Sequence, residues 1–119
     1  MMDYFKLETY VPEEFAEMVK DALAAAGAGK LGDYDHCFWQ TVGAGEFRPL
    51  DTAHPFIGSA GGGLEKVREV KLETICPADR RREVISALKA AHPYECCAYY
   101  LFPVEMADDT PSEGENDVH

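Results

Sequence analysis

Basic residues are scarce in this chain of 119 residues, where 11 lysines and arginines stand against 22 aspartates and glutamates and give a net charge of −11. A protein that binds a nucleic-acid backbone or an anionic membrane surface needs a basic footprint. The sequence also lacks a run of about 18 apolar residues and a basic segment followed by an apolar one near its start. It therefore predicts no nucleic-acid partner, no membrane partner and a cytoplasmic location.

The motifs of several enzyme classes are missing as well. The sequence has no G-x-S-x-G, no H-E-x-x-H, no dinucleotide-binding glycine fingerprint and no P-loop. Its cysteines, Cys37, Cys76, Cys96 and Cys97, form no C-x-x-C pair, and a chain without an export signal keeps its thiols reduced. We interpret them as buried thiols, with a role as metal ligands or as a redox pair as the alternative.

What the sequence does contain is one segment twice. Lys6–Pro12 and Lys71–Pro77, 65 positions apart, agree at five of seven positions, and the segments that follow raise the agreement to ten of 24. Chance would give about one or two identities at average residue usage. Each copy alternates apolar and polar residues, then passes through a proline into an apolar stripe of helical spacing, which indicates a duplicated strand and helix.

The predicted elements are strands over 4–11, 34–42, 69–76 and 98–104 and helices over 13–26 and 78–91. The inner face of the first repeated strand is predicted to consist of Phe5, Leu7, Thr9 and Val11, and that of the second of Val70, Leu72, Thr74 and Cys76. The first helix presents an apolar stripe of Phe15, Met18, Val19, Ala22, Leu23 and Ala26. The order βαββαβ with right-handed crossovers predicts an α+β, ferredoxin-like fold with sheet order 4-1-3-2 and both helices on one face. In that sheet Lys6 lies opposite Glu73 and Glu8 opposite Lys71.

Two segments depart from this plan. Residues 43–63 form a glycine-rich insertion inside a domain that spans residues 1–105, and a structureless loop of that length is typical of a binding loop, a lid or an oligomer contact. Residues 106–119 are acidic and poor in large apolar side chains, which predicts a disordered tail.

The candidate metal ligands are His36, His54, His92 and Glu95, with Cys37 and Cys96 as soft ligands. Imidazole, carboxylate and thiolate groups bind zinc or copper, so the sequence predicts a divalent transition metal at these residues. A structural role is the alternative. His92 and Pro93 then end a helix, Glu95 caps a backbone amide, and His36 is a hydrogen-bonded histidine beside Phe38 and Trp39.

Four motifs carry a resemblance to a known family. They are Tyr34-Asp35-His36-Cys37, the segment 43–49, His54-Pro55-Phe56-Ile57-Gly58 and Ala91-His92-Pro93-Tyr94-Glu95. Together they resemble the free-standing form of the domain inserted in YqfO-type proteins of the Nif-three-like family, over residues 4–104, and the H-P-Y-E element also resembles CutA, the divalent-cation-tolerance protein. This resemblance implies a PII-like or CutA-like fold and a homo-oligomer, with a trimer favoured. Within these motifs Tyr34, Asp35 and Tyr94 are candidate ligand contacts.

The resemblance has two limits. The relatives follow H-P-Y-E with a proline-containing pair, whereas this chain has Cys96 and Cys97. The family's two-metal site and the GTP cyclohydrolase label belong to a core domain that these 119 residues do not include. The resulting prediction is a small oligomeric binding or regulatory module for a metal ion or small ligand, without catalysis of its own. The alternatives are a metal-dependent hydrolase and a pure oligomerisation module.

Overall fold

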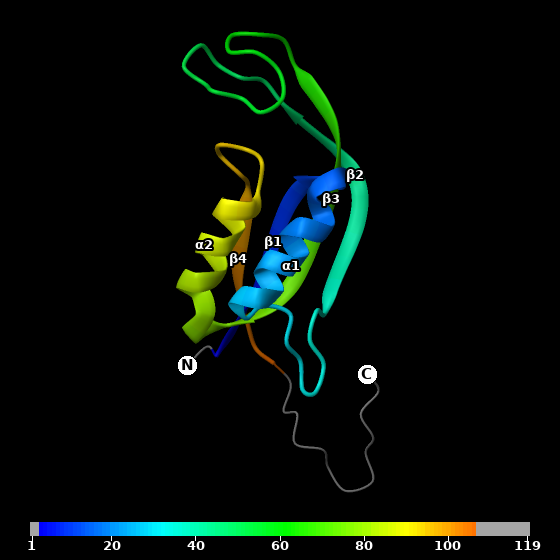
Figure 1. The fold of residues 1–119 in the computed structure, drawn as a ribbon, viewed down its shortest axis with the longest axis vertical. Helices are drawn as coiled ribbons and strands as arrows, with labels where there is room; N and C mark the ends of the chain where they lie inside the picture. The colour runs from blue at the N-terminus through cyan, green and yellow to red at the C-terminus, as the bar shows by residue number, and fades with distance from the viewer. Residues whose placement is uncertain (1–2, 107–119) are drawn as a thin grey trace, which may run out of the picture.

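A computed structural model describes residues 3–106 and shows a four-stranded antiparallel sheet covered by helices (Figure 1). In chain order the elements are β1 (Tyr4–Pro12), the 3₁₀ turn η1 (Glu13–Phe15), α1 (Ala16–Ala26), β2 (Phe38–Phe47), β3 (Glu65–Pro77), the 3₁₀ turn η2 (Ala78–Arg80), α2 (Arg81–Ala91) and β4 (Tyr99–Val104). The strand order β2-β3-β1-β4 is the predicted 4-1-3-2 read from the other edge, so the predicted fold is confirmed. The predicted tail lies outside the described residues from residue 107 onward.

The duplication is visible in the element boundaries. η1 and α1 begin at Glu13 and Ala16, and η2 and α2 begin at Ala78 and Arg81, in each case 65 residues later. β1 and β3 end at the two prolines of the repeat and pair with each other in the centre of the sheet. Proline suits this junction because it has no backbone N–H to contribute to a ladder or to the first helical turn.

The hydrophobic core lies between the two helices and one face of the two central strands. The predicted inner faces of β1 and β3 are buried, and the helices contribute Ala16, Val19, Leu23, Val84 and Leu88. The stripe predicted for the first helix is wrong at Met18, which is 48% exposed. The buried stripe is centred on Ala16, Val19 and Leu23, at i, i+3 and i+7, and Met18 falls on its flank.

The ends of the two helices differ. α1 ends at Gly27, which adopts the left-handed conformation (φ 116°) that costs little only for glycine. α2 ends at His92, whose extended backbone (φ −72°, ψ 134°) is the one favoured before a proline. The second end therefore directs the chain away from the helix at once, into the loop 92–98 that leads to β4.

The predicted insertion begins as a β-arm, which we define as residues 43–47 of β2 paired with residues 65–69 of β3. β2 begins at Phe38 rather than at Tyr34, because residues 29–37 close a turn in which Cys37 N–H donates to Gly29 O (2.8 Å). The strand then continues through residues 43–47, where it pairs with Glu65–Glu69 of β3. The prediction of a structureless segment over 43–63 is therefore wrong for its first five residues, since their backbone groups are satisfied by the partner strand, and the connecting loop is 48–64.

The central strands are offset by two residues from the predicted register. Glu8 lies opposite Glu73, and Lys6 lies opposite Ile75. The predicted ion pairs nevertheless form across the diagonal, with Lys6 Nζ 2.6 Å from Glu73 and 3.1 Å from Glu8, and Lys71 Nζ 3.5 Å from Glu8. Long lysine side chains reach diagonal neighbours, so the alternation of charge did not fix the register.

None of the four cysteines is in a disulfide, and only Cys76 is fully buried; Cys37 and Cys97 are half-buried and Cys96 is exposed. Burial raises the pKa of the Cys76 thiol to about 11, which makes it an unreactive thiol at neutral pH. Our interpretation of all four as buried thiols is therefore wrong for Cys96. Within residues 3–106, no helix has both the length and the apolar character needed to cross a bilayer.

Candidate functional site

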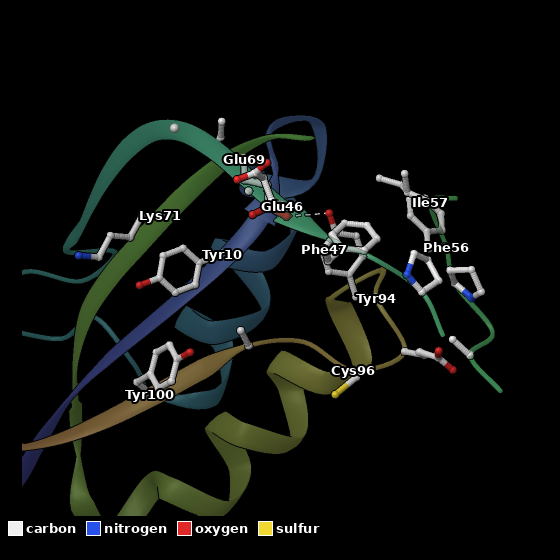
Figure 2. A pocket seen from close by; sticks show the side chains of 18 of the residues that line it. Tyr10, Glu46, Phe47, Phe56, Ile57, Glu69, Lys71, Tyr94, Cys96 and Tyr100 are labelled. Carbon is white, nitrogen blue, oxygen red and sulfur yellow. Dashed lines mark hydrogen bonds between the residues drawn. The ribbon is translucent and has the colours of Figure 1, made fainter. Parts of the chain in front are cut away.

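A groove of about 660 Å³ lies on the face of the sheet that the helices leave uncovered. We call it the aromatic groove. It runs from the outer faces of β1, β2 and β3 to the loop 92–98 and to the loop 48–64 that follows the arm (Figure 2). Its lining comprises Tyr10, Thr41, Val42, Gly43, Ala44, Gly45, Glu46, Phe47, Pro49, Ala53, Pro55, Phe56, Ile57, Glu69, Lys71, Tyr94, Glu95, Cys96, Ala98 and Tyr100.

Aromatic rings stand on two sides of this groove. Tyr10 and Tyr100, from the neighbouring strands β1 and β4, meet edge to face with ring centroids 6.2 Å apart. Phe47 and Tyr94 make a second edge-to-face pair at 5.6 Å, and Phe56 of the loop 48–64 lies 6.5 Å from Tyr94. Figure 2 shows Tyr10 and Tyr100 standing apart from Phe47 and Tyr94. Such edge-to-face pairs stabilise the wall itself and leave ring surface for a ligand.

The carboxylate of Glu69 is held between Tyr94 and Gly45 in the groove. The Tyr94 hydroxyl donates to its Oε2 at 2.7 Å, and its other oxygen lies over the backbone of Gly45, where a Cβ would come within 2.0 Å of Oε1. Burial, followed by the hydrogen bond to Glu69 and its charge, raises the pKa of the Tyr94 phenol, so Tyr94 stays protonated and keeps donating. The Tyr94 hydroxyl thus holds one oxygen of the Glu69 carboxylate, and the lack of a side chain at Gly45 leaves room for the other.

His92 supports this arrangement from behind the groove. Its ring is 5% exposed, its Nε2 lies 2.6 Å from Tyr10 O, and the backbone N–H of Tyr94 donates to its Nδ1 at 3.2 Å. Because Nδ1 accepts, the proton of the neutral ring is on Nε2, which donates to Tyr10. Burial lowers the pKa of His92, against the opposing effects of the Tyr10 carbonyl and the Glu69 carboxylate. Both ring nitrogens are bonded to backbone groups, and His92 also caps the C-terminus of α2, the place that the structural alternative gives it.

The other predicted residues fall into two separate places. Tyr34, Asp35, His36 and Cys37 lie in the turn between α1 and β2, at the lower end of the sheet in Figure 1, whereas the loop 92–98 lies at the upper end. His36 has a left-handed backbone (φ 54°) and lies beside two surface carboxylates, with Nδ1 3.3 Å from Asp35 and Nε2 3.8 Å from Asp21. The structure therefore does not bring His36 and His92 together within one chain.

His54, Glu95 and Cys96 lie on adjacent loops at the groove's end. The backbone N–H of His54 donates to Glu95 Oε1 at 2.7 Å, which ties the loop 48–64 to the loop 92–98. Glu95 thus bonds a backbone amide, as the structural alternative predicts. Among residues 3–106, no three His, Cys, Asp or Glu side chains are arranged to hold a metal ion. The assignment of zinc or copper stays a prediction.

Sequence reasoning missed most of the groove. Tyr10, Tyr100, Glu69 and Gly45 belong to four different segments and to no shared motif. Two signals were available. The motif segments 43–49, 54–58 and 91–95 contribute much of the lining, and the alternation in the strands put Tyr10 and Glu69 on the outer face with aromatic and charged neighbours. Their convergence with Tyr94 depends on how the arm and the loop 92–98 fold over that face.

Comparison with known proteins places the chain in a family. It is 50% identical over 108 residues to a "GTP cyclohydrolase 1 type 2 homolog" of Bacillus subtilis (strain 168), covering 91% of this chain and 28% of that protein. A protein of the same name from Mycobacterium tuberculosis (strain ATCC 25618 / H37Rv) is 47% identical over 100 residues, covering 84% of this chain and 26% of that protein. No family model matches. The chain thus spans about a quarter of the curated relatives it matches.

The solved structures agree with this. A Bacillus cereus protein related to NIF3 superimposes with a TM-score of 0.73 at 41% identity, covering 88% of this chain and 26% of that one. The chain carries a domain of the NIF3-like family. The periplasmic divalent cation tolerance protein CutA from Archaeoglobus fulgidus superimposes with a TM-score of 0.61 at 19% identity, covering 87% of this chain and 86% of that one. For this NIF3-like domain the CutA likeness shows the fold alone.

Proposed function

We propose that this NIF3-like domain is a small binding or regulatory module that takes a small ligand in the aromatic groove and has no catalytic activity of its own. The observation that carries the proposal is the groove, which has the size and the mixture of aromatic rings and few polar groups typical of ligand sites. The positioned carboxylate of Glu69 and the hydroxyls of Tyr10, Tyr94 and Tyr100 would orient the ligand. The cyclohydrolase name of the relatives describes proteins about four times longer, and the proposal does not extend that activity to this domain.

The test is a fragment screen by two-dimensional ¹H–¹⁵N NMR on the whole chain. Ligands of the groove should shift the amide signals of residues 41–47, 69–71 and 94–100 together. Tyr100→Ala removes one wall of the groove and should weaken such binding at least about fivefold, in line with the loss of an aromatic contact. Tyr34→Ala, in the turn at the other end of the sheet, is the matched control and should leave binding unchanged. Fragments that bind equally well to both variants would contradict the proposal.

The metal prediction calls for its own measurement. His54, Glu95 and Cys96 offer the nearest approach to a ligand set, because the hydrogen bond from His54 N–H to Glu95 holds their loops together. We expect zinc titrated into the protein, purified without a histidine tag, to bind less tightly as pH falls from 7 to 6, since a protonated imidazole cannot ligate. His54→Ala should weaken binding at least tenfold and His36→Ala should not. Absence of zinc and copper binding to the wild-type chain would remove the metal from the proposal.

We also propose that the domain acts as a homo-oligomer, with a trimer favoured. β2 is an edge strand with Trp39 69% and Val42 45% exposed, and edges of this kind are normally covered in proteins. The arm extends the same strand beyond the body of the sheet (Figure 1). Sedimentation of a monomer at micromolar concentration would contradict this part of the proposal and leave ligand binding in the groove untouched.

A further inference from the structure

We propose that the ligand of the aromatic groove is a small organic cation, with its amine or quaternary ammonium group beside Glu69 and its apolar body against the aromatic rings. This inference rests on the proposed function, because it takes the groove as the ligand site. It adds the chemical class of the ligand, which neither the relatives nor the fold supplies.

The charges around the groove favour a cation. Its charged lining consists of the carboxylates of Glu46, Glu69 and Glu95 and the single ammonium of Lys71. Lys71 is directed toward carboxylates outside the groove, with Nζ 3.5 Å from Glu8. A site with this balance disfavours phosphates and carboxylates and attracts positive charge.

The aromatic rings favour a cation for a separate reason. A cation within about 6 Å of a tyrosine or phenylalanine ring face is attracted by the negative charge of that face, and the attraction grows when the site excludes water. Figure 2 shows the carboxylates of Glu46 and Glu69 at one border of a space flanked by Tyr10 and Tyr100 and by Phe47 and Tyr94. An organic cation can therefore contact a carboxylate with its charged group and the aromatic rings with its apolar body. A bare metal ion has no apolar body to place against the rings.

The geometry of Glu69 supplies the acceptor. Tyr94 occupies Oε2, and Oε1 lies over Gly45 on the neighbouring strand, so the carboxylate is held before a ligand arrives. A charge-assisted hydrogen bond from an ammonium group to a fixed carboxylate is stronger than one to a neutral acceptor, and fixing it in advance avoids the entropy cost of ordering the side chain on binding.

The experiment compares three probes that share one apolar body and differ in charge: phenethylamine, 2-phenylethanol and phenylacetate. Each is titrated into the ¹⁵N-labelled wild-type chain at pH 7.5 and followed by NMR. We expect phenethylamine to shift groove signals and to bind at least about fivefold tighter than 2-phenylethanol, with phenylacetate the weakest. If 2-phenylethanol or phenylacetate binds as tightly, the cation inference is wrong and the groove stands as a ligand site. If no probe shifts groove signals, the proposed function fails with it.

Two pairs of variants test whether the preference for a cation depends on Glu69. Glu69→Gln keeps an acceptor for Tyr94 but loses the charge, and should reduce the ratio of amine to alcohol affinity to below about twofold. Glu83→Gln makes the same change on the exposed surface of α2 and should keep the wild-type ratio. Equal effects of the two would show a long-range field rather than contact with Glu69, and would overturn the inference.

The second pair leaves every charge in place. Gly45→Ala puts a methyl group where Glu69 Oε1 lies and must displace the carboxylate, so it should also lower the ratio at least twofold. Gly63→Ala, in the loop 48–64 but outside the lining of the groove, meets no atom within 4 Å and serves as the control. An unchanged ratio in Gly45→Ala would contradict the role given to the fixed carboxylate.

Discussion

Replacing His92 by glutamine tests how the histidine behind the groove is held. Wild-type His92 is buried and neutral, with Nδ1 accepting from the Tyr94 N–H and Nε2 donating to the Tyr10 carbonyl. Burial lowers its pKa in the folded state below the ordinary value near 6.5. Between those two pKa values the unfolded chain binds a proton that the folded chain does not, so stability is full above pH 6.5 and falls as the pH drops toward the folded pKa.

The magnitude follows from proton linkage. One proton taken up only by the unfolded state costs about 1.4 kcal/mol for each pH unit below 6.5, so between pH 7.5 and 5.5 the loss from His92 is at most about 1.4 kcal/mol. Glutamine carries a similar acceptor and donor but does not titrate. We expect His92→Gln to be destabilised by about 1–3 kcal/mol at pH 7.5, because the two buried hydrogen bonds are imperfectly replaced, and to lose less stability than the wild type on acidification.

The assay is urea unfolding at pH 7.5, 6.5 and 5.5, with the free energy of unfolding taken by linear extrapolation. His36→Gln is the control, since His36 is exposed and its ring nitrogens lie beside the exposed carboxylates of Asp21 and Asp35. The change in the free energy of unfolding between pH 7.5 and 5.5 should be closer to the wild-type value in His36→Gln than in His92→Gln. Parallel pH dependences for the wild type and His92→Gln would refute the reasoning.

Three further predictions concern the core, the outer face and the edge of the sheet. Leu72→Ala, at a residue 1% exposed in the central strand, should lower the free energy of unfolding by about 2–5 kcal/mol in urea titrations, and a loss under about 1 kcal/mol would contradict its place in the core. Lys6→Met should destabilise the fold, more at low than at high salt, because Glu8 and Glu73 lie directly opposite each other and lose a shared counter-ion. Thermal unfolding at 20 and 500 mM NaCl measures this effect, and an unchanged melting temperature at both salt concentrations would refute it. Trp39→Glu should shift the proposed homo-oligomer toward monomer in analytical ultracentrifugation, and an unchanged sedimentation coefficient would contradict an interface at this edge.

The duplicated segment was enough to predict the fold because it carries two kinds of period at once. Strand alternation in Lys6–Pro12 and Lys71–Pro77 set the inner faces, and the apolar spacing after each proline set the helices. Chirality and loop lengths then leave few ways to join two such units into one sheet. The register could not be predicted, because lysines satisfy carboxylates across a diagonal as well as directly.

The site was less accessible to sequence reasoning. The sequence predicts His36 and His92 as metal ligands. In the structure, both ring nitrogens of His92 are bonded to backbone groups, and His36 lies in the turn at the far end of the sheet. The sequence motifs make Tyr34 and Tyr94 candidate ligand contacts alike, but the structure puts Tyr94 in the groove wall and Tyr34 in that distant turn. A motif records which residues are near in the chain, and a ligand site depends on which are near in space.

The sequence by itself determined the order of elements, the buried faces and the pairing of the two repeated strands, since periodicity and proline positions act over a few residues. Only the tertiary structure decided that residues 43–47 extend a strand, that Gly45 lies against Glu69, and that Tyr10, Tyr94 and Tyr100 share one groove. These contacts join five segments up to 90 residues apart, and backbone hydrogen bonds between strands, rather than local preference, bring most of them together.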